Sequence, residues 1–285
     1  MPEQKQIYAT FSEADLKSFE PELKVGLLAT VNEEGLPHIT LITTLSANSP
    51  GQLYWGQFSE GLSKVNIRSN QKTGFLIMTL DKNMWRGKAN FVNTATAGKE
   101  YEQLNCNPMF RYNAYFGIHT VYYLDLVEHR GKEPLPMGGI ILAAVKTIAA
   151  KTLAGKGAGR EVINPLTHRL IDKIDNLKFL SYVDKDGYPV ITPVIQAQTA
   201  GGDRIIFASS VYEKDLKAVT QDTVVALFCM SLEMQMVLLR GVFKGFKTIA
   251  GLECGSMDVD WVYNPMPPSQ GQVYPEQKLE AVTAF

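Results

Sequence analysis

The chain has 285 residues, and its 28 Lys and Arg against 29 Asp and Glu give a formal net charge of −1. A chain of this length forms about two domains with large apolar cores, and its balanced charge argues against a nucleic-acid partner. The three cysteines form no Cys-x-x-Cys pair, which excludes a disulfide framework and a tetrahedral zinc site. Because the first residues lack the apolar stretch of a secretory signal, we expect a cytoplasmic location.

The first predicted element is a β-hairpin at residues 27–40, LLATVNEEGLPHIT, in which two apolar strands flank an acidic turn closed by glycine. A similar segment, FLSYVDKDGYPVIT, occupies residues 179–192. The residues that recur 152 positions later include Val31, Gly35, Pro37 and Thr40. The likeness continues from QLYWGQFSEGLSKV to RIIFASSVYEKDLKAV and from TGFLIM to VVALFCM. The sequence therefore predicts one structural unit present twice.

Later in each copy, alternation of apolar and polar residues predicts long strands. Apolar positions at 116–126 alternate with His119 and Asp125, and those at 257–263 alternate with Asp258 and Asp260. Strands with one polar face are typical of antiparallel sheets or barrels. Helices are sparse in the sequence and are expected near residues 99–106, 140–153, 166–174 and 212–220. We therefore expect a mainly β fold, made of antiparallel sheets or of β-barrels with flanking helices.

An apolar stretch at residues 137–159 lies between the two copies. Lysines interrupt it, and its uninterrupted apolar part ends at Val145, short of the about 20 residues that a membrane span requires. We expect a helix of a water-soluble protein here and no membrane partner. The predicted organisation is a first domain at 1–135, a connecting helix and linker at 136–165, and a second domain with a C-terminal arm at 166–285.

Residues 53–70, LYWGQFSEGLSKVNIRSN, carry the clearest candidate for chemistry. An apolar strand runs into Ser59, Gly61, Ser63 and Lys64 at the start of a short predicted helix. Hydroxyls, an ammonium and free helix-start amides are the donors that a phosphate dianion needs. A capped helix with a solvated lysine has the same pattern, so both interpretations stay open for this segment alone.

Other chemistries find less support. The four histidines have none of the spacings of paired metal ligands, and we expect no metal site. No Gly-x-Ser-x-Gly nucleophile is present, and no glycine-rich turn opens a helix after a strand. Serine hydrolase and dinucleotide-binding folds are therefore not expected.

The order of these features resembles the FMN-binding split β-barrel superfamily related to pyridoxamine 5'-phosphate oxidase. The resemblance rests on the acidic glycine turn, the Pro-His-Ile-Thr strand, the aromatic strand leading to Ser63 and Lys64, and the following NIRSNQKTGFLIM. It covers residues 25–130 and, in the second copy, 175–264. It implies two tandem FMN-binding split-barrel domains.

The resemblance also implies the residues of the cofactor site. Ser59, Ser63 and Lys64 would hold the phosphate of FMN. Two strand segments would border the flavin ring, the first made of Thr40, Leu41, Ile42 and Thr43 and the second containing Trp55 and Gln57. The family's second phosphate cation has two candidates here, Arg68 and Arg86.

The second copy departs from the pattern, because Lys214 and Asp215 stand where we expect the Ser-Lys pair. A carboxylate there would repel a phosphate, and Ser209, Ser210 and Lys217 would compensate only in part. We therefore expect one FMN per chain, in the first copy. Four aromatic residues are candidates for covering the ring or for packing, namely Tyr112, Tyr115, Trp261 and Tyr263.

The function implied by this resemblance is an FMN-dependent oxidoreductase acting on an unidentified small substrate or electron donor. The sequence identifies no catalytic residue. The C-terminal segment lacks the Arg-rich signature of pyridoxamine 5'-phosphate oxidation, which is therefore not expected. A non-catalytic flavin carrier is one alternative, and a haem-handling split barrel with His38 or His119 as ligand is another. We also expect a homodimer.

Overall fold

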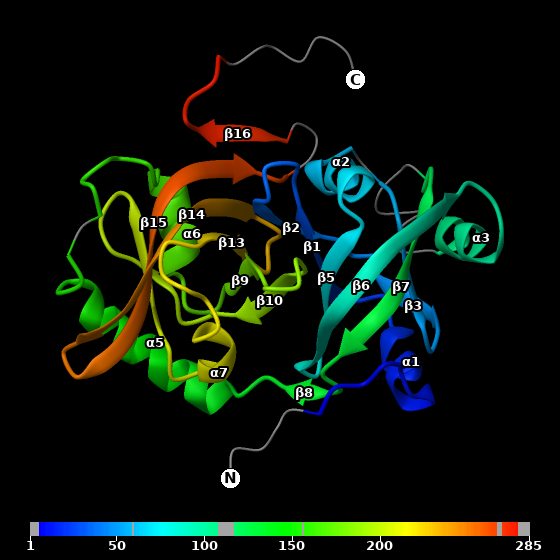
Figure 1. The fold of residues 1–285 in the computed structure, drawn as a ribbon, viewed down its shortest axis with the longest axis horizontal. Helices are drawn as coiled ribbons and strands as arrows, with labels where there is room; N and C mark the ends of the chain where they lie inside the picture. Colours follow the sequence, from blue (N-terminus) through cyan, green and yellow to red (C-terminus); the bar gives the residue numbers. More distant parts are fainter. Residues whose placement is uncertain (1–5, 59, 108–116, 156, 267–269, 279–285) are drawn as a thin grey trace. The chain divides into compact units, whose positions relative to one another are not determined.

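The computed structural model describes residues 6–58, 60–107, 117–155, 157–266 and 270–278 (Figure 1). Contacts divide the chain into two compact units. Unit 1 comprises Met1–Pro136 and Ser181–Ile191, and unit 2 comprises Met137–Leu180 and Thr192–Phe285. The division at Pro136 falls where the connecting helix was expected to begin, and the helix itself groups with unit 2.

The first sheet has eight antiparallel strands in the order β2-β1-β5-β6-β7-β4-β3, with β8 paired to β6. Its strands are β1 Lys24–Val31, β2 Pro37–Leu41, β3 Ser46–Ser49, β4 Gln52–Gly56, β5 Lys72–Thr79, β6 Asn83–Ala95, β7 Val121–His129 and β8 Glu133–Pro134. The helices described with it are α1 Glu13–Phe19, α2 Leu62–Ser69 and α3 Lys99–Cys106.

The second sheet repeats this order as β10-β9-β13-β14-β15-β12-β11, with β16 paired to β15. Its strands are β9 Leu177–Val183, β10 Pro189–Pro193, β11 Gln198–Thr199, β12 Arg204–Ala208, β13 Val224–Met230, β14 Met236–Ile249, β15 Leu252–Asn264 and β16 Gly271–Tyr274. Its helices are α5 Met137–Lys151, α6 Pro165–Asp172 and α7 Glu213–Leu216. The predicted duplication and the mainly β fold are confirmed.

Glycine forms the turn of the first hairpin in each copy. Gly35 has a φ of +78° and Gly187 a φ of +82°, a left-handed conformation that costs other residues more. The amide of Gly35 donates to the carbonyl of Asn32, and that of Gly187 donates to the carbonyl of Asp184. The turns predicted from the sequence are thus confirmed.

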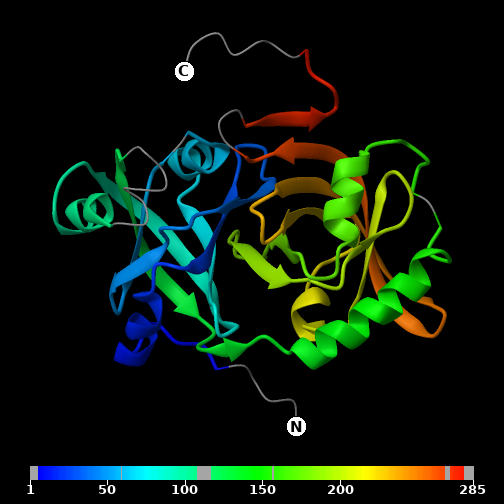
Figure 2. The same ribbon diagram turned by 180° about the vertical axis from the view of Figure 1, so that it is seen from behind.

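The strands of the first sheet are strongly curved, as Figures 1 and 2 show, and a large apolar cluster is buried among them. Leu28 of β1, Phe75 of β5 and Trp55 of β4 belong to the same buried cluster, although β1 and β4 lie near opposite edges of the strand order. Strands so far apart in the order share a core only when the sheet bends back on itself. The barrel-like curvature expected from the alternating strands is present.

One side chain in each copy ties the connection after the second strand to the aromatic strand. Thr44 Oγ1 donates to the carbonyl of Gly56 and accepts from its amide, both at 3.0 Å. Gln196, 152 positions later, donates from Nε2 to the carbonyl of Ala208 at 2.7 Å. Different side chains therefore make the same link at equivalent places.

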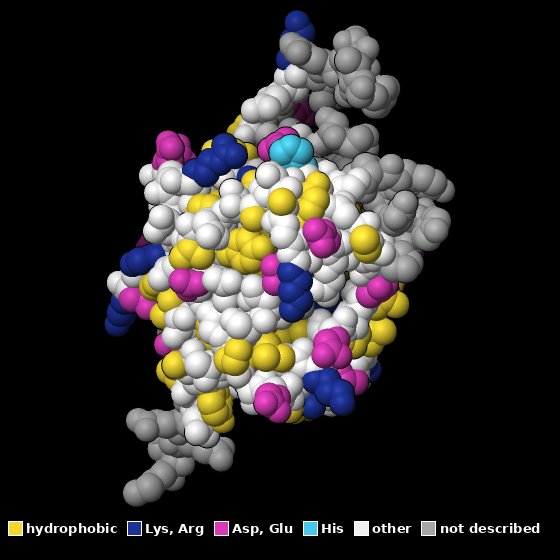
Figure 3. Space-filling model, turned by 90° about the vertical axis from the view of Figure 1, so that its right-hand side faces the viewer, with side chains coloured by type: hydrophobic (Ala, Val, Ile, Leu, Met, Phe, Trp, Pro, Cys, Tyr) yellow, Lys and Arg dark blue, Asp and Glu magenta, His cyan; other side chains and the backbone are white. Residues whose placement is uncertain are grey.

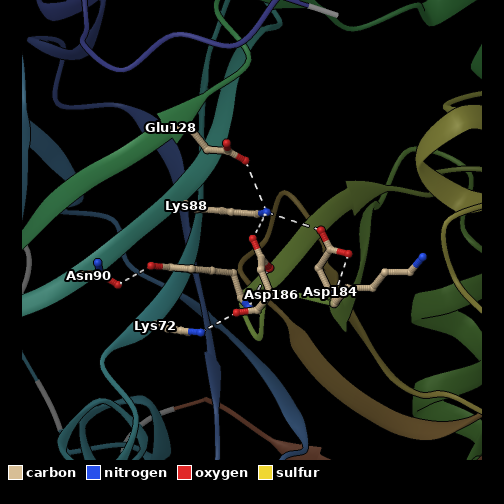
Figure 4. A network of polar contacts seen from close by, with 8 residues as sticks. Lys72, Lys88, Asn90, Glu128, Asp184 and Asp186 are labelled. Atoms are coloured by element: carbon tan, nitrogen blue, oxygen red, sulfur yellow. Dashed lines mark hydrogen bonds and ion pairs between the residues drawn. The ribbon is translucent and has the colours of Figure 1, made fainter.

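The tip of the β9–β10 hairpin groups with unit 1 because a polar network holds it there (Figure 4). Lys88 Nζ of β6 lies 2.6 Å from Asp186 Oδ2 and 3.4 Å from Asp184 Oδ2. Tyr188 Oη donates to Asn90 Oδ1 at 2.9 Å. Lys72 of β5 donates to the backbone carbonyl of Asp186.

The helix α5 lies across β11, β12 and β15 (Figure 1). It buries one face, formed by Ile140, Ala143, Ala144, Thr147 and Ala150. Among the described residues, no helix has both the length and the apolar character needed to cross a membrane.

Candidate functional site

The helix α2 begins after a glycine, which has no side chain to cap it. This N-cap, Gly61, is in an extended conformation, and no side-chain capping bond is made among the described residues. The amide of Lys64 donates to the carbonyl of Gly61 at 3.2 Å, which leaves the amides of Leu62 and Ser63 without an intrahelical partner and able to serve a ligand. Ser63 and Lys64 lie in this first turn and are buried. Ser59, also expected at the site, lies outside the described residues.

Lys64 presents a buried ammonium at this helix start. Its side chain is 4% exposed, and Nζ lies 2.9 Å from Oε2 of Glu60, whose side chain is 85% exposed. In the described part of the chain, the Glu60 carboxylate is thus a counter-ion of this buried ammonium. Burial lowers the pKa of Lys64, and the Glu60 carboxylate opposes that shift. A buried cation of this kind favours an anionic partner.

A chain of contacts leads from this ion pair to the aromatic strand. Gln57 Nε2 donates to Glu60 Oε1 at 2.8 Å, and Tyr122 Oη donates to Gln57 Oε1 at 2.9 Å. The rings of Trp55 and Tyr122 are stacked, with centroids 4.1 Å apart and planes at 5°. The structure therefore brings together three of the predicted residues, namely Trp55, Gln57 and Lys64.

Sequence reasoning missed the two residues that complete this chain, Glu60 and Tyr122. The separation of four residues between Glu60 and Lys64 was a signal, since such pairs are neighbours on a helix and its first turn. Tyr122 lies directly across from Trp55 in the β4–β7 ladder. That pairing joins residues 67 positions apart, and no local pattern in the sequence shows it.

The structure separates the two candidates for a second phosphate cation. Arg68 is one turn beyond Lys64 on α2 and forms a hydrogen bond with Tyr122. Burial raises the pKa of Tyr122, and Arg68 opposes this rise. Arg86 is buried on β6, and its Nε and Nη2 donate to Glu133 Oε2 at 3.1 and 3.0 Å. Arg86 also donates to the carbonyl of Ile191. Arg86 therefore serves a structural ion pair, and Arg68 is the cation beside the candidate site.

The predicted first strand segment lies on and just beyond β2. Thr40 and Leu41 end β2, whereas Ile42 packs against the core of the first sheet. The helix α2 packs on β1 and β2 and is anchored by Asn66 Nδ2, which donates to Thr30 Oγ1 at 3.0 Å.

Thr43 lines a separate small cavity of about 180 Å³, together with residues of α1, β4 and α3. Sites for small organic ligands usually measure about 300 to 1,000 Å³. This cavity is too small for a flavin. The contacts of Thr43 there give no link to the chain of contacts that joins Trp55, Gln57 and Lys64.

The second copy has an acidic residue at the equivalent place. Strands β4 and β12 lie 152 residues apart, and at this spacing Asp215 is equivalent to Ser63 and Leu216 to Lys64. The pairing expected from the sequence, Lys214 and Asp215 for Ser63 and Lys64, is thus shifted by one residue. Asp215 is 6% exposed, and Leu216 is fully buried.

Two of the three residues expected to compensate in the second copy, Lys217 and Ser209, are engaged with carboxylates. Lys217 Nζ lies 2.7 Å from Glu213 Oε1 and 3.4 Å from Glu253 Oε2. Ser209 Oγ donates to Glu253 Oε2 at 2.5 Å. These contacts leave an acidic environment around the start of α7, which disfavours a phosphate.

Of the four candidate ring-covering residues, Tyr112 and Tyr115 lie outside the described residues. Trp261 and Tyr263 of β15 stack on each other with centroids 5.2 Å apart. Trp261 Nε1 donates to Gln272 of β16, and the guanidinium of Arg240 lies over the Trp261 ring at 3.9 Å. These contacts fit the packing interpretation of both residues.

On the face shown in Figure 3, Lys and Arg side chains are interspersed with Asp and Glu side chains and with hydrophobic ones, so this face presents no patch of a single charge.

No protein-family model matches this chain, and no curated protein matches it. Solved structures match about two fifths of it. An FMN-binding protein from Syntrophomonas wolfei is 13% identical, with 42% of this chain and 84% of that protein covered and a TM-score of 0.36. An F420 reductase is 16% identical, with coverages of 42% and 98% and a TM-score of 0.34. A FAD-binding protein from Mesorhizobium loti is 13% identical, with coverages of 43% and 96% and a TM-score of 0.28. These are likenesses of fold.

Proposed function

We propose that the first repeat binds FMN, with its phosphate at the start of α2. The observation that supports this most is the buried ammonium of Lys64 beside uncapped helix amides and the Ser63 hydroxyl. A phosphate dianion accepts several short, charge-assisted hydrogen bonds from such donors. Arg68 is the second cation, and Ser59 completes the hydroxyl set.

The described residues fit a bound flavin on a second count. Two of the proposed ligands have a buried nitrogen: Lys64 Nζ has the exposed Glu60 carboxylate at 2.9 Å, and Trp55 Nε1 has no hydrogen-bond acceptor among the described residues. Buried donors are normally paired, so an acceptor from a bound molecule is a natural complement. Gln57 lies between them in the chain of contacts and would border the flavin, as would the segment from Thr40 to Thr43.

The proposed activity is that of a flavin-dependent oxidoreductase acting on a small substrate. Bound FMN supplies hydride and single-electron chemistry. The chain would hold the phosphate through Ser63 and Lys64 and orient the flavin through Gln57. Trp55 and Tyr122 are buried and would exclude water from that side. We assign no catalytic acid or base. We further propose one FMN per chain, a cytoplasmic location and a homodimer.

A fluorescence-quenching titration of the purified chain with FMN and with riboflavin tests the phosphate site. We expect FMN to bind at least tenfold more tightly, since each charge-assisted bond contributes about 1.5 to 3 kcal/mol. Equal affinities would refute the phosphate site. Reduction of the bound flavin by a nicotinamide or deazaflavin donor, followed by transfer to an acceptor, would distinguish an oxidoreductase from a flavin carrier.

A further inference from the structure

Glu60 engages two of the proposed FMN ligands at once. Its Oε2 faces Lys64 Nζ at 2.9 Å, and its Oε1 accepts from Gln57 Nε2 at 2.8 Å. Both oxygens of the Glu60 carboxylate therefore contact groups that the proposed function assigns to FMN binding, the ammonium of Lys64 and the amide of Gln57. Lys64 holds the pKa of Glu60 below its usual value, so this carboxylate is charged at neutral pH.

We propose that Glu60 is a displaceable substitute for the ligand phosphate, an inference that rests on the proposed FMN site. The two partners differ in their access to water. The Lys64 side chain is buried and needs an anion, whereas the Glu60 side chain is 85% exposed and can turn into solvent. A ligand that brings its own anion therefore replaces Glu60 without leaving the ammonium unpaired.

This arrangement selects ligands by charge. A phosphate monoester carries about −1.5 to −2 at pH 7 and replaces a carboxylate of charge −1 with a gain in attraction. A neutral ligand such as riboflavin gains nothing from displacing Glu60. The ligand class favoured at this place is a flavin that ends in a phosphate monoester.

The second copy offers a matched control. Glu213 and Lys217 of α7 form an ion pair with the same spacing of four residues, at 2.7 Å. Both side chains are about half exposed, at 54% and 47%. Because water solvates both partners, this pair should have no bearing on FMN.

The experiment compares Glu60→Gln and Glu213→Gln with the parent chain in FMN and riboflavin titrations at pH 7. Removing the competing carboxylate should tighten FMN about fivefold, the scale of one partly exposed ion pair. Riboflavin affinity should stay unchanged, and Glu213→Gln should behave as the parent does. Unchanged or weaker FMN binding by Glu60→Gln would overturn the proposal, and weaker binding would make Glu60 a positioning residue.

A thermal-unfolding measurement gives a second readout. Without ligand, Glu60→Gln should unfold at a lower temperature than the parent because Lys64 loses its anion, and saturating FMN should raise its midpoint by more than it raises the parent's. Equal FMN-induced rises in the two proteins would count against displacement. Glu60→Asp retains the charge and should follow the parent.

The titrations distinguish failure of the FMN site from failure of the role of Glu60. If the parent itself does not distinguish FMN from riboflavin, the proposed FMN site is wrong. If the parent prefers FMN but Glu60→Gln does not bind it more tightly, only the proposed role of Glu60 is wrong.

Discussion

Asp215 occupies in the second repeat the position that Ser63 occupies in the first, 152 residues earlier, and both side chains are buried in the first turn of a helix. An acidic residue in the first turn stabilises the helix, because its negative charge is attracted by the partial positive charge of the helix N-terminus. The same carboxylate repels a phosphate. In the same fold, the N-terminus of α2 in the first copy is suited to bind an anion, whereas the N-terminus of α7 in the second copy already contains the Asp215 carboxylate.

Replacing Ser63 by Asp should abolish FMN binding in the first repeat while the fold survives. The second repeat shows that an aspartate is tolerated at this position, so the midpoint of thermal unfolding should change little. We expect FMN affinity to fall at least a hundredfold, because a hydrogen-bond donor becomes a negative charge. Ser63→Ala, which removes only the hydroxyl, should lose about tenfold. Retained FMN binding by Ser63→Asp would show that the phosphate lies elsewhere.

The lysines of the two copies should differ in their effect on FMN. Lys64→Ala should weaken binding by roughly tenfold to more than a hundredfold, corresponding to about 1.5 to 3 kcal/mol for a charge-assisted contact. Lys214→Ala and Lys217→Ala should change it little, since Asp215 disfavours phosphate there. Calorimetric titration of the three variants with FMN measures these affinities. If Lys217→Ala lost FMN and Lys64→Ala retained it, the cofactor would belong to the second copy.

Replacing Gly35 by Val should destabilise the fold without affecting FMN chemistry. A Cβ at Gly35 would meet nothing within 4 Å, so the cost comes from its φ of +78° alone. That cost is about 1 kcal/mol or more for a β-branched residue. Gly51 also has open space around it, without a positive φ, and Gly51→Val is the control. Equal unfolding midpoints for the two variants in urea would contradict the conformational argument.

Lys88 should stabilise the attachment of the β9–β10 hairpin tip to unit 1. Burial alone would lower the pKa of Lys88, but the carboxylates of Asp186, Glu128 and Asp184 outweigh it and raise the pKa. Lys88→Met leaves these carboxylates without their cation and should cost about 1 to 3 kcal/mol of unfolding free energy. Hydrogen exchange should quicken at hairpin amides 184–188.

A matched lysine controls for the loss of one surface charge. Lys244 pairs only weakly with Asp222, at 3.4 Å, and both side chains are exposed. Lys244→Met should therefore leave the urea midpoint and the exchange of the hairpin amides as they are in the parent. If Lys88→Met and Lys244→Met behaved alike, the network would not hold the hairpin.

Lys178 should make the stability rise with pH in the alkaline range. It is fully buried, donates from Nζ to the carbonyls of Lys173 and Ile195 at 2.9 Å, and burial lowers its pKa from 10.5 to about 8. Between these two pH values the unfolded chain binds the proton and the folded chain does not, so the free energy of unfolding increases with pH. Each unit of pKa difference corresponds to about 1.4 kcal/mol. Urea unfolding from pH 7.5 to 10.5 measures it, and Lys178→Met should lack this part of the rise.

The sequence alone determined the features that depend on neighbours along the chain. Gly35 and Gly187, each set in an acidic turn between apolar strands, revealed the two hairpins because a tight turn needs a left-handed residue. The constant spacing of 152 revealed the duplication, and alternating side chains indicated antiparallel sheets. The start of α2 at residues 61–64 followed from local composition. These patterns lie in the order of residues along the chain, so they can be recognised without knowing which residues meet in space.

Only the tertiary structure decided which side chains meet across the sheets. Tyr122 stacks on Trp55 because β7 pairs with β4. Arg86 forms an ion pair with Glu133, which lies 47 residues later in the chain. Such contacts depend on strand register and on the curvature of the sheet, which follow from packing of the whole core and not from any local segment.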